Sequence, residues 1–154
     1  MPEKKTIARA RKDERQGKAA STQAGEFVRE EIEHVREGKH GARSTKQAIA
    51  IGLSKARRAG VKLAAPKKKE GTSATTRRRA EKDLERGAKA PAKPATSARR
   101  SRAAKAALAK EGHRAASKAS LAKQARSAAR KRTPAERSAA ARKAARTRQA
   151  ARRK

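Results

Sequence analysis

The sequence predicts an all-α protein in which a small helical hairpin carries an extended, partly disordered helical tail rich in Ala, Lys and Arg, without a large core. Two observations lead to this prediction. Charged residues make up 39% of the 154 residues and aromatic residues only 1%. From residue 65 onward the only large aliphatic side chains are Leu84, Leu108 and Leu121. So little apolar surface does not offset the conformational entropy of ordering, of order 1–2 kcal/mol per residue.

Residues 1–20 read as a basic N-terminal arm. Residues 4–16 are good helix formers, and Gly17 is suited to end a helix there. Ile7 is the only large apolar side chain in that helix. We therefore expect a solvated helix or a frayed arm.

Residues 21–63 contain the only cluster of large apolar side chains and predict an antiparallel helical hairpin. The first helix is expected to run from a cap at Ser21 or Thr22 to about Glu37, where Gly38 ends it. Its apolar residues recur at helical spacing and share one face, with Phe27 at the edge of that face. The acidic residues fall towards the other side: Glu26, Glu30, Glu33 and Glu37.

The second helix of the hairpin begins at a capping box, with Ser44 at the N-cap and Gln47 three residues later. It is expected to run to about Ala59. Gly52 is a small residue on its apolar face and allows another helix to approach closely. The predicted hairpin core comprises apolar residues from both helices: Val28, Ile32, Val35, Ile49 and Leu53.

Two further segments follow. Residues 64–97 read as a linker with a short helix from about residue 75 to 86, which Gly87 ends. Residues 98–154 read as a basic tail, helical or disordered. Within that tail Thr133 and Glu136 form a second capping box, with Pro134 at the favoured first helical position.

The charge of the tail predicts its partner. The chain carries a net charge of +32, and residues 65–154 hold 30 of its 46 Lys and Arg residues. Cations in this number are typical of proteins that bind phosphate backbones and release counterions. A tail that covers ~15 phosphates would give a slope of log K against log salt of about −13. The expected phosphate contacts are Lys67, Lys68, Lys69, Arg77, Arg78, Arg79, Arg99, Arg100, Arg102, Lys105, Lys110, Arg114, Lys118, Lys123, Arg126, Arg130, Lys131, Arg132, Arg142, Lys143, Arg146, Arg148, Arg152, Arg153 and Lys154.

The expected function is therefore non-specific binding of duplex DNA by a histone-like protein of the bacterial nucleoid, in the cytoplasm. Base stacking on aromatic side chains is the usual basis of specific RNA recognition, and Phe27 is the only Phe, Tyr or Trp residue in the chain. An RNA- or ribosome-associated basic protein is the first alternative. An interaction adaptor that uses residues 21–63 is the second, and this hairpin also offers a surface for self-association.

Other classes of function find little support. The chain has no Cys, which excludes disulfides and thiolate chemistry. No apolar run approaches the roughly 20 residues that span a bilayer, so we expect no membrane span. Glu30 and His34 lie four residues apart with Glu37 nearby, but ordinary ion pairs on an exposed helix face explain this spacing better than a metal. We expect no metal, no cofactor and no enzymatic activity.

One part of the chain resembles a known family. The stretch Lys46–Arg57 reads Lys-Gln-Ala-Ile-Ala-Ile-Gly-Leu-Ser-Lys-Ala-Arg. Together with the preceding helix, residues 21–63 resemble a bacterial family of short basic proteins whose function is unknown. By composition alone, the tail resembles the C-terminal tails of linker histones and of bacterial histone-like proteins, which implies DNA compaction.

Overall fold

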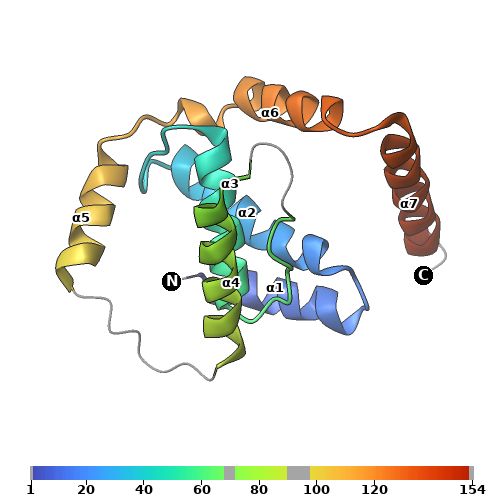
Figure 1. Ribbon diagram of the computed structural model, residues 1–154, viewed down its shortest axis with the longest axis horizontal. Coiled ribbons are helices and arrows are strands. Elements are labelled where there is room, and N and C mark those ends of the chain that lie inside the picture. The colour runs from blue at the N-terminus through green and yellow to red at the C-terminus, as the bar shows by residue number, and fades with distance from the viewer. Residues whose placement is uncertain (1, 68–71, 90–97, 153–154) are drawn as a thin grey trace. The chain divides into compact units, whose positions relative to one another are not determined.

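The computed structural model describes residues 2–67, 72–89 and 98–152. Every regular element in these ranges is helical, which confirms the predicted all-α class (Figure 1). Residues Met1–Ser117 form one compact unit, unit 1, and Lys118–Lys154 form a second, unit 2. The elements are α1 (Lys4–Arg15), α2 (Ala20–Arg36), α3 (Thr45–Arg58), α4 (Ala74–Ala88), α5 (Ala98–Ala109), the 3₁₀ turn η1 (Arg114–Ala116), α6 (Lys118–Arg130) and α7 (Pro134–Arg152).

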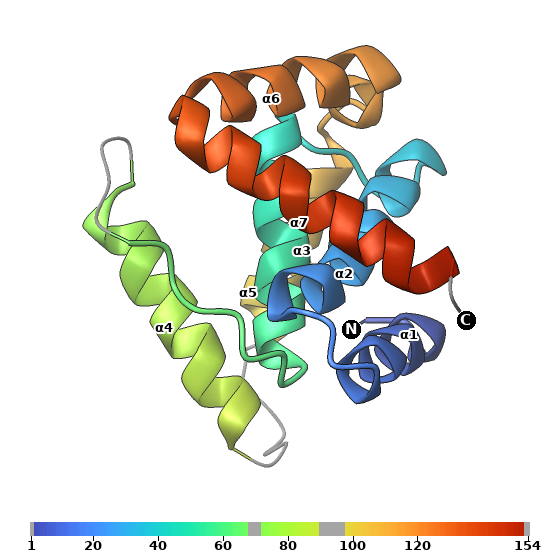
Figure 2. The ribbon, with the colours of Figure 1, turned by 90° about the vertical axis from the view of Figure 1, so that its right-hand side faces the viewer.

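The first four helices of unit 1 pack in chain order. Helix α1 lies against α2, α2 against α3, and α3 against α4. Figures 1 and 2 both show α3 between α2 and α4. Positive φ angles at Gly17, Gly38 and Gly60 follow the ends of α1, α2 and α3, as expected where a chain leaves a helix through a left-handed residue.

The core of unit 1 is built around Phe27, whose exposed fraction is 1%. Ala10, Ala24, Ala56 and Val61 surround it. Small Ala side chains let the helix backbones approach one another, so one aromatic ring and a few aliphatic groups suffice to fill the centre. Phe27 is therefore the middle of the apolar face and not its edge. Four half-buried residues complete the cluster: Ile7, Ala20, Leu53 and Leu63.

The N-terminal segment differs from the expected solvated arm. Thr6 is 2% exposed and Ala10 is 4% exposed, because α1 packs along α2. The sequence shows Ile7 as the only large apolar side chain of this helix. Helix α1 instead buries small side chains, and their burial depends on the close approach of α1 to α2 and not on a large apolar face.

The two helices of the predicted hairpin do pack together. A Cβ atom at Gly52 would lie 2.6 Å from the Cα of Val28, so the small residue is what permits the contact between α2 and α3. Ile32 and Val35 are buried, whereas Val28, Ile49 and Leu53 are half-buried. The buried face of α2 is thus rotated from the predicted one towards Phe27.

Helix α4 extends through Gly87 to Ala88 and does not end at Gly87 as expected. A Cβ atom there would lie 1.9 Å from the carbonyl oxygen of Arg57. Gly87 is therefore a site of close contact between α4 and α3. The hydroxyl of Ser54 on α3 also donates a hydrogen bond to the carboxylate of Asp83 on α4. The expected linker helix is thus a packed element of unit 1.

The segment from Leu108 to Ser117 also belongs to unit 1, although it was expected to lie in the tail. The backbone N–H of Gly41 donates to the carbonyl of Leu108 at 2.9 Å. The hydroxyl of Thr45 donates to the carbonyl of Ala115 at 2.6 Å. Ala115 and Ala116 are buried against α2 and α3, so the free tail is shorter than the sequence predicted.

Two N-caps were predicted correctly. The N–H of Gln47 donates to the Ser44 hydroxyl at 3.2 Å. Thr133 and Glu136 exchange hydrogen bonds at 2.9 and 3.2 Å, which is the reciprocal pattern of a capping box. The predicted cap of α2 at Ser21 or Thr22 is wrong: the N-cap is Ala19, whose side chain makes no capping hydrogen bond.

The expectation of partial disorder finds no support in residues 98–152, which are helical over most of their length. Ala, Arg and Lys are strong helix formers, and this propensity is expressed here despite the repulsion between like charges. Among the described residues, none of the helices has the length and apolar character that a membrane crossing requires.

Candidate nucleic-acid interface

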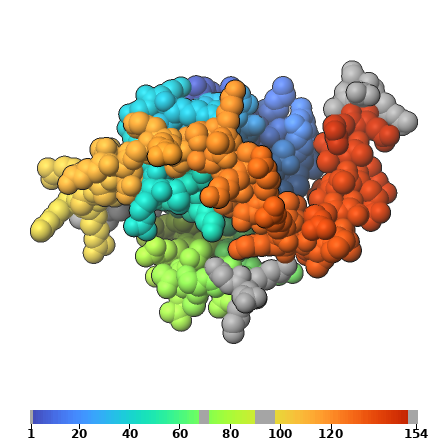
Figure 3. Space-filling view, turned by 90° about the horizontal axis from the view of Figure 1, so that it is seen from above, coloured from blue at the N-terminus to red at the C-terminus, as the bar shows by residue number. Residues whose placement is uncertain are grey.

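The cationic side chains of unit 2 stand on two exposed helices. Between residues 118 and 150 the chain has eleven Lys and Arg residues and one acidic residue, Glu136. Helix α6 buries none of its residues, and residues 131–150 are all exposed. Figure 3 shows α6 in orange and α7 in red as surface elements. Unit 2 is therefore a pair of solvated helices with a large excess of positive charge.

Helix α6 gathers three of these cations on one side. Lys123, Arg126 and Arg130 are separated by three and four residues, and this spacing places their side chains on one helix face. They line a shallow depression together with Ser127 and Lys131. The three side chains reach outward over about 10 Å of helix, since each residue advances the axis by about 1.5 Å.

Helix α7 distributes its cations differently. Arg142 and Arg146 are four residues apart and share a face, while Arg137, Lys143 and Arg148 point in other directions at 3.6 residues per turn. All five side chains are exposed. A single straight polyanion can contact only part of this set at one time.

The predicted contacts in unit 1 are spread over several elements. Arg78 and Arg79 on α4 are exposed, and Arg77 on the same helix lies 3.8 Å from Glu81. Of the others, Lys67 precedes a gap in the described residues, and the remaining cations are exposed on or near α5 and η1: Arg99, Arg100, Arg102, Lys105, Lys110 and Arg114. The structure brings these residues into no single cluster with one another.

Some predicted contacts cannot be placed. Lys68, Lys69, Arg153 and Lys154 lie outside the described residues, as does the side chain of Arg152. The remaining predicted contacts of unit 2 are exposed at the start of α6 and in its connection to α7: Lys118, Lys131 and Arg132.

Unit 1 also contains a buried charged cluster that the sequence did not reveal. Glu30 was expected on the side of α2 opposite its apolar face, and Glu31 was not assigned, yet both are buried, with Glu31 at 0% exposure. Lys55 of α3 reaches between them, with its Nζ 3.3 Å from Glu30 Oε1 and 2.6 Å from Glu31 Oε2. The side chain of Lys55 is only 15% exposed. These three residues form an ion-pair network between α2 and α3.

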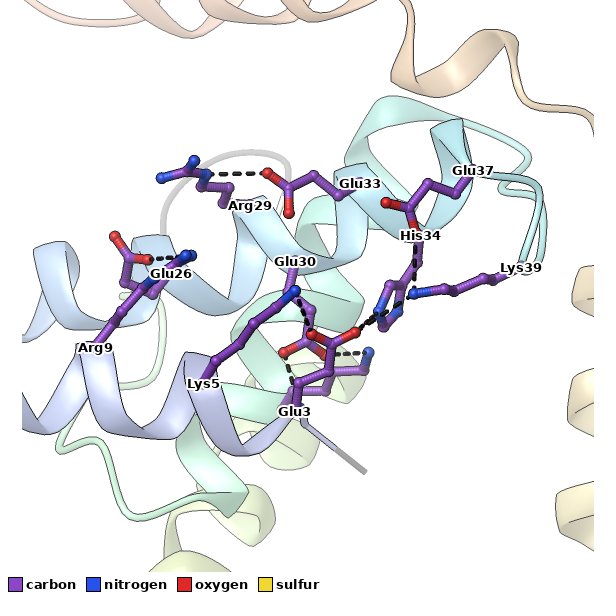
Figure 4. Close-up of polar contacts among 11 residues, drawn as sticks. Glu3, Lys5, Arg9, Glu26, Arg29, Glu30, Glu33, His34, Glu37 and Lys39 are labelled. Carbon is purple, nitrogen blue, oxygen red and sulfur yellow. Dashed lines mark hydrogen bonds and ion pairs between the residues drawn. The ribbon is translucent and has the colours of Figure 1, made fainter.

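The start of the chain completes this network (Figure 4). The N–H of Glu3 donates to Glu30 Oε2 at 3.1 Å. The Glu3 carboxylate lies 3.0 Å from His34 Nε2, 3.0 Å from Lys5 Nζ and 3.4 Å from Lys39 Nζ. Glu3, the N-cap residue of α1, therefore joins α1 to α2 through charged contacts.

These contacts perturb two carboxyl groups. The hydrogen bond with His34, followed by that with Lys5, lowers the pKa of Glu3 from 4.5 to about 2. Burial raises the pKa of Glu30, but hydrogen bonds from Thr6 and from the Glu3 N–H, together with the charge of Lys55, outweigh it and leave the pKa lowered. Both groups are therefore carboxylates near neutral pH.

The metal set that the sequence suggested is not assembled. Glu30 is directed to Glu3 and Lys55, and Glu37 pairs with Lys39 at 3.0 Å. His34 lies instead with Glu31 and with His40 from the α2–α3 loop. The adjacent residues Glu30 and Glu31 could have indicated this buried charged cluster, because only one of two neighbouring carboxylates on a helix can point directly away from the buried face.

Comparison with known proteins adds one match. No curated protein and no solved structure is significantly similar to the chain. One family model matches the whole of α1, α2 and α3 and the start of the following segment, in agreement with the expected resemblance to proteins of unknown function. Residues 3–69 match the model of a family of unknown function, DUF6496.

Proposed function

We propose that the protein binds duplex DNA without sequence preference, as a histone-like protein of the bacterial nucleoid, and that α6 and α7 provide most of its phosphate contacts. The observation that carries this proposal is the exposure of eleven cations against one acidic residue between residues 118 and 150, on two helices of unit 2 and the turn that joins them. Charge of one sign at this density attracts polyanions and releases their counterions.

The dimensions of α6 fit this role. Duplex DNA carries one charge per about 1.7 Å of its axis. The face formed by Lys123, Arg126 and Arg130 spans about 10 Å of helix, so it runs beside roughly six phosphate charges. An α-helix also fits into the major groove, which is about 12 Å wide. Short Ala side chains between the cations allow a close approach to the backbone.

The same helices offer little for sequence reading. They contain neither Asn nor an aromatic residue, and Gln124 and Gln149 are their only amide side chains. Direct reading of bases depends mostly on positioned Arg, Asn and Gln side chains, and specific RNA binding on aromatic stacking. The composition therefore supports backbone contacts that are shared by all sequences.

The proposal is tested by measuring duplex binding of two charge-matched variants over a range of salt concentrations. One variant changes Lys123, Arg126 and Arg130 to Gln. The control changes one Lys and two Arg residues that are exposed on α1, namely Lys4, Arg11 and Arg15. The α6 variant is expected to reduce the steepness of the salt dependence by about 3 and to weaken all sequences equally.

Two results would count against the proposal. An equal effect of both variants would mean that net charge acts and that α6 is no interface. Tighter binding of structured RNA than of duplex DNA at matched salt would favour the RNA-associated alternative. The test compares both nucleic acids with the same protein sample.

A further inference from the structure

Unit 1 brings together three side chains that commonly bind metal ions. Glu31 and His34 lie one turn apart on α2, and His40 comes from the loop between α2 and α3. One potential ligand atom of each lies within 4.8 Å of the other two. The two imidazole rings meet edge to face, with their centroids 6.1 Å apart.

Glu31 is the most unusual member of the set. It is fully buried, and neither of its oxygens accepts a hydrogen bond of good geometry. Lys55 Nζ lies near Oε2, as described above, while His40 Nε2 lies 3.3 Å from Oε1. A buried carboxylate is costly unless positive charge compensates it. Lys55 is shared by the buried carboxylates of Glu30 and Glu31, so these two negative charges have one buried Lys between them.

The orientation of His40 points to where a second cation would lie. Nδ1 of His40 is 3.1 Å from the carbonyl oxygen of Gly41, and a carbonyl only accepts, so Nδ1 carries the hydrogen. In a neutral ring Nε2 then presents its lone pair to Glu31 Oε1, which is also an acceptor. A backbone carbonyl on one nitrogen and a free lone pair on the other is the usual arrangement of a metal-binding histidine.

The local charge is also favourable. Three carboxylates lie in this cluster, those of Glu3, Glu30 and Glu31, while Lys55 is its one buried cation. Lys5 and Lys39 contact Glu3 only from the exposed side. In a chain of net charge +32, this is a region where negative charge exceeds buried positive charge.

We propose that Glu31, His34 and His40 bind a divalent transition-metal ion, for which Zn²⁺ is the best match. Zn²⁺ takes imidazole nitrogen and carboxylate oxygen at about 2.0–2.2 Å, and three such ligands leave a fourth position for water. Glu31 would bind through Oε1, while Lys55 holds Oε2 as an outer-shell partner. To bring all three ligand atoms to bonding distance of one ion, the loop after Gly38 would have to move slightly.

The consequence is structural. His40 is followed by Gly41 and Ala42, whose N–H groups donate to the carbonyls of Leu108 and Gly112. An ion that fixes His40 to α2 would therefore also hold the loop on which residues 108–112 dock. Metal binding would stabilise the end of unit 1 that precedes the cationic helices.

The test uses the full-length, untagged protein after treatment with a chelator. Titration calorimetry is expected to show one site for Zn²⁺ and none of similar affinity for Mg²⁺. Variants His34→Gln and His40→Gln are expected to lose more than the roughly 10- to 100-fold that outer-shell changes cost. His113→Gln is the matched control, because His113 is exposed and lies outside the set, and it is expected to bind as the unmodified protein does.

A second measurement needs no variant. Co²⁺ added to the unmodified protein is expected to give the intense visible absorption of a four-coordinate site, and Zn²⁺ is expected to abolish it. The proposal is wrong if Zn²⁺ does not bind, if Mg²⁺ binds equally well, if the Co²⁺ spectrum is that of the hydrated ion, or if His113→Gln weakens binding as much as His40→Gln.

Discussion

Lys55 is expected to be the most important charged residue for the stability of unit 1. Its Nζ lies between two buried carboxylates, 3.3 Å from Glu30 and 2.6 Å from Glu31. The change Lys55→Met keeps the aliphatic stem and removes the charge. Both carboxylates then remain buried without their shared cation, and removal of one partner from a buried pair costs about 3–5 kcal/mol. Small domains are stable by only about 5–15 kcal/mol.

Urea unfolding followed by far-ultraviolet circular dichroism measures this loss of stability, with a chelator present. Amide NMR signals of α2 and α3 show that the measured transition is the unfolding of unit 1. Lys46→Met on the same helix is the control, since Lys46 is exposed and such changes usually stay within about 0.5 kcal/mol. Adding Glu30→Gln to Lys55→Met is expected to restore part of the loss, because one of the unpaired charges is gone. Equal stability of Lys55→Met and Lys46→Met would refute the reasoning.

Three further outcomes are expected. Phe27→Ala removes the centre of the core and is expected to lower the free energy of unfolding by about 3–5 kcal/mol in the same urea assay; a loss below 1 kcal/mol would contradict this packing. Gly87→Ala is expected to loosen α4 and to speed its hydrogen exchange, because the new Cβ would lie 1.9 Å from the Arg57 carbonyl oxygen. Gly112→Ala, which meets nothing within 4 Å, is expected to leave that exchange unchanged. Because the folded-state pKa of Glu3 is lowered from 4.5 to about 2, its contribution to stability is complete above pH 4.5 and is lost as the pH falls towards 2. The chemical shifts of α1 measured by NMR over this pH range test the prediction, and shifts that do not change would contradict it.

Local sequence signals predicted part of the fold well. The Ser44 and Thr133 caps were correct because a capping box depends only on residues within one helical turn. Gly52 was recognised as a contact residue because its position on the helix face is fixed by spacing. Helix existence in the tail followed from composition alone, since Ala, Arg and Lys favour helix strongly.

The packing of distant segments was not predictable in the same way. The sequence showed only one large apolar side chain near Thr6 and Ala10, that of Ile7, which is too weak a local signal to predict their burial against α2. Gly87 looked like a helix end, although its small size serves contact with Arg57. In each case the deciding partner lies far away in the chain.

The buried charged cluster was missed for the same reason. Glu30 was expected on the solvent side of α2 because the pattern of apolar residues in a single helix indicates only one buried face. Helix α1 covers a second face through Glu3, and Lys55 arrives from α3. The phosphate contacts of the tail could be proposed from composition alone, because highly charged side chains are expected to be exposed to solvent.

The salt dependence of duplex DNA binding by the full-length protein tests the central claim most directly. One face of α6 presents three cations and one face of α7 presents two, so contacts from these residues give a slope of log K against log salt of about −4.5. Engagement of ~15 phosphates by the whole second half would steepen the slope to about −13. A measured slope between these values agrees with phosphate contacts made by the cationic helices. A slope near −2, or no binding at physiological salt, would contradict the proposal.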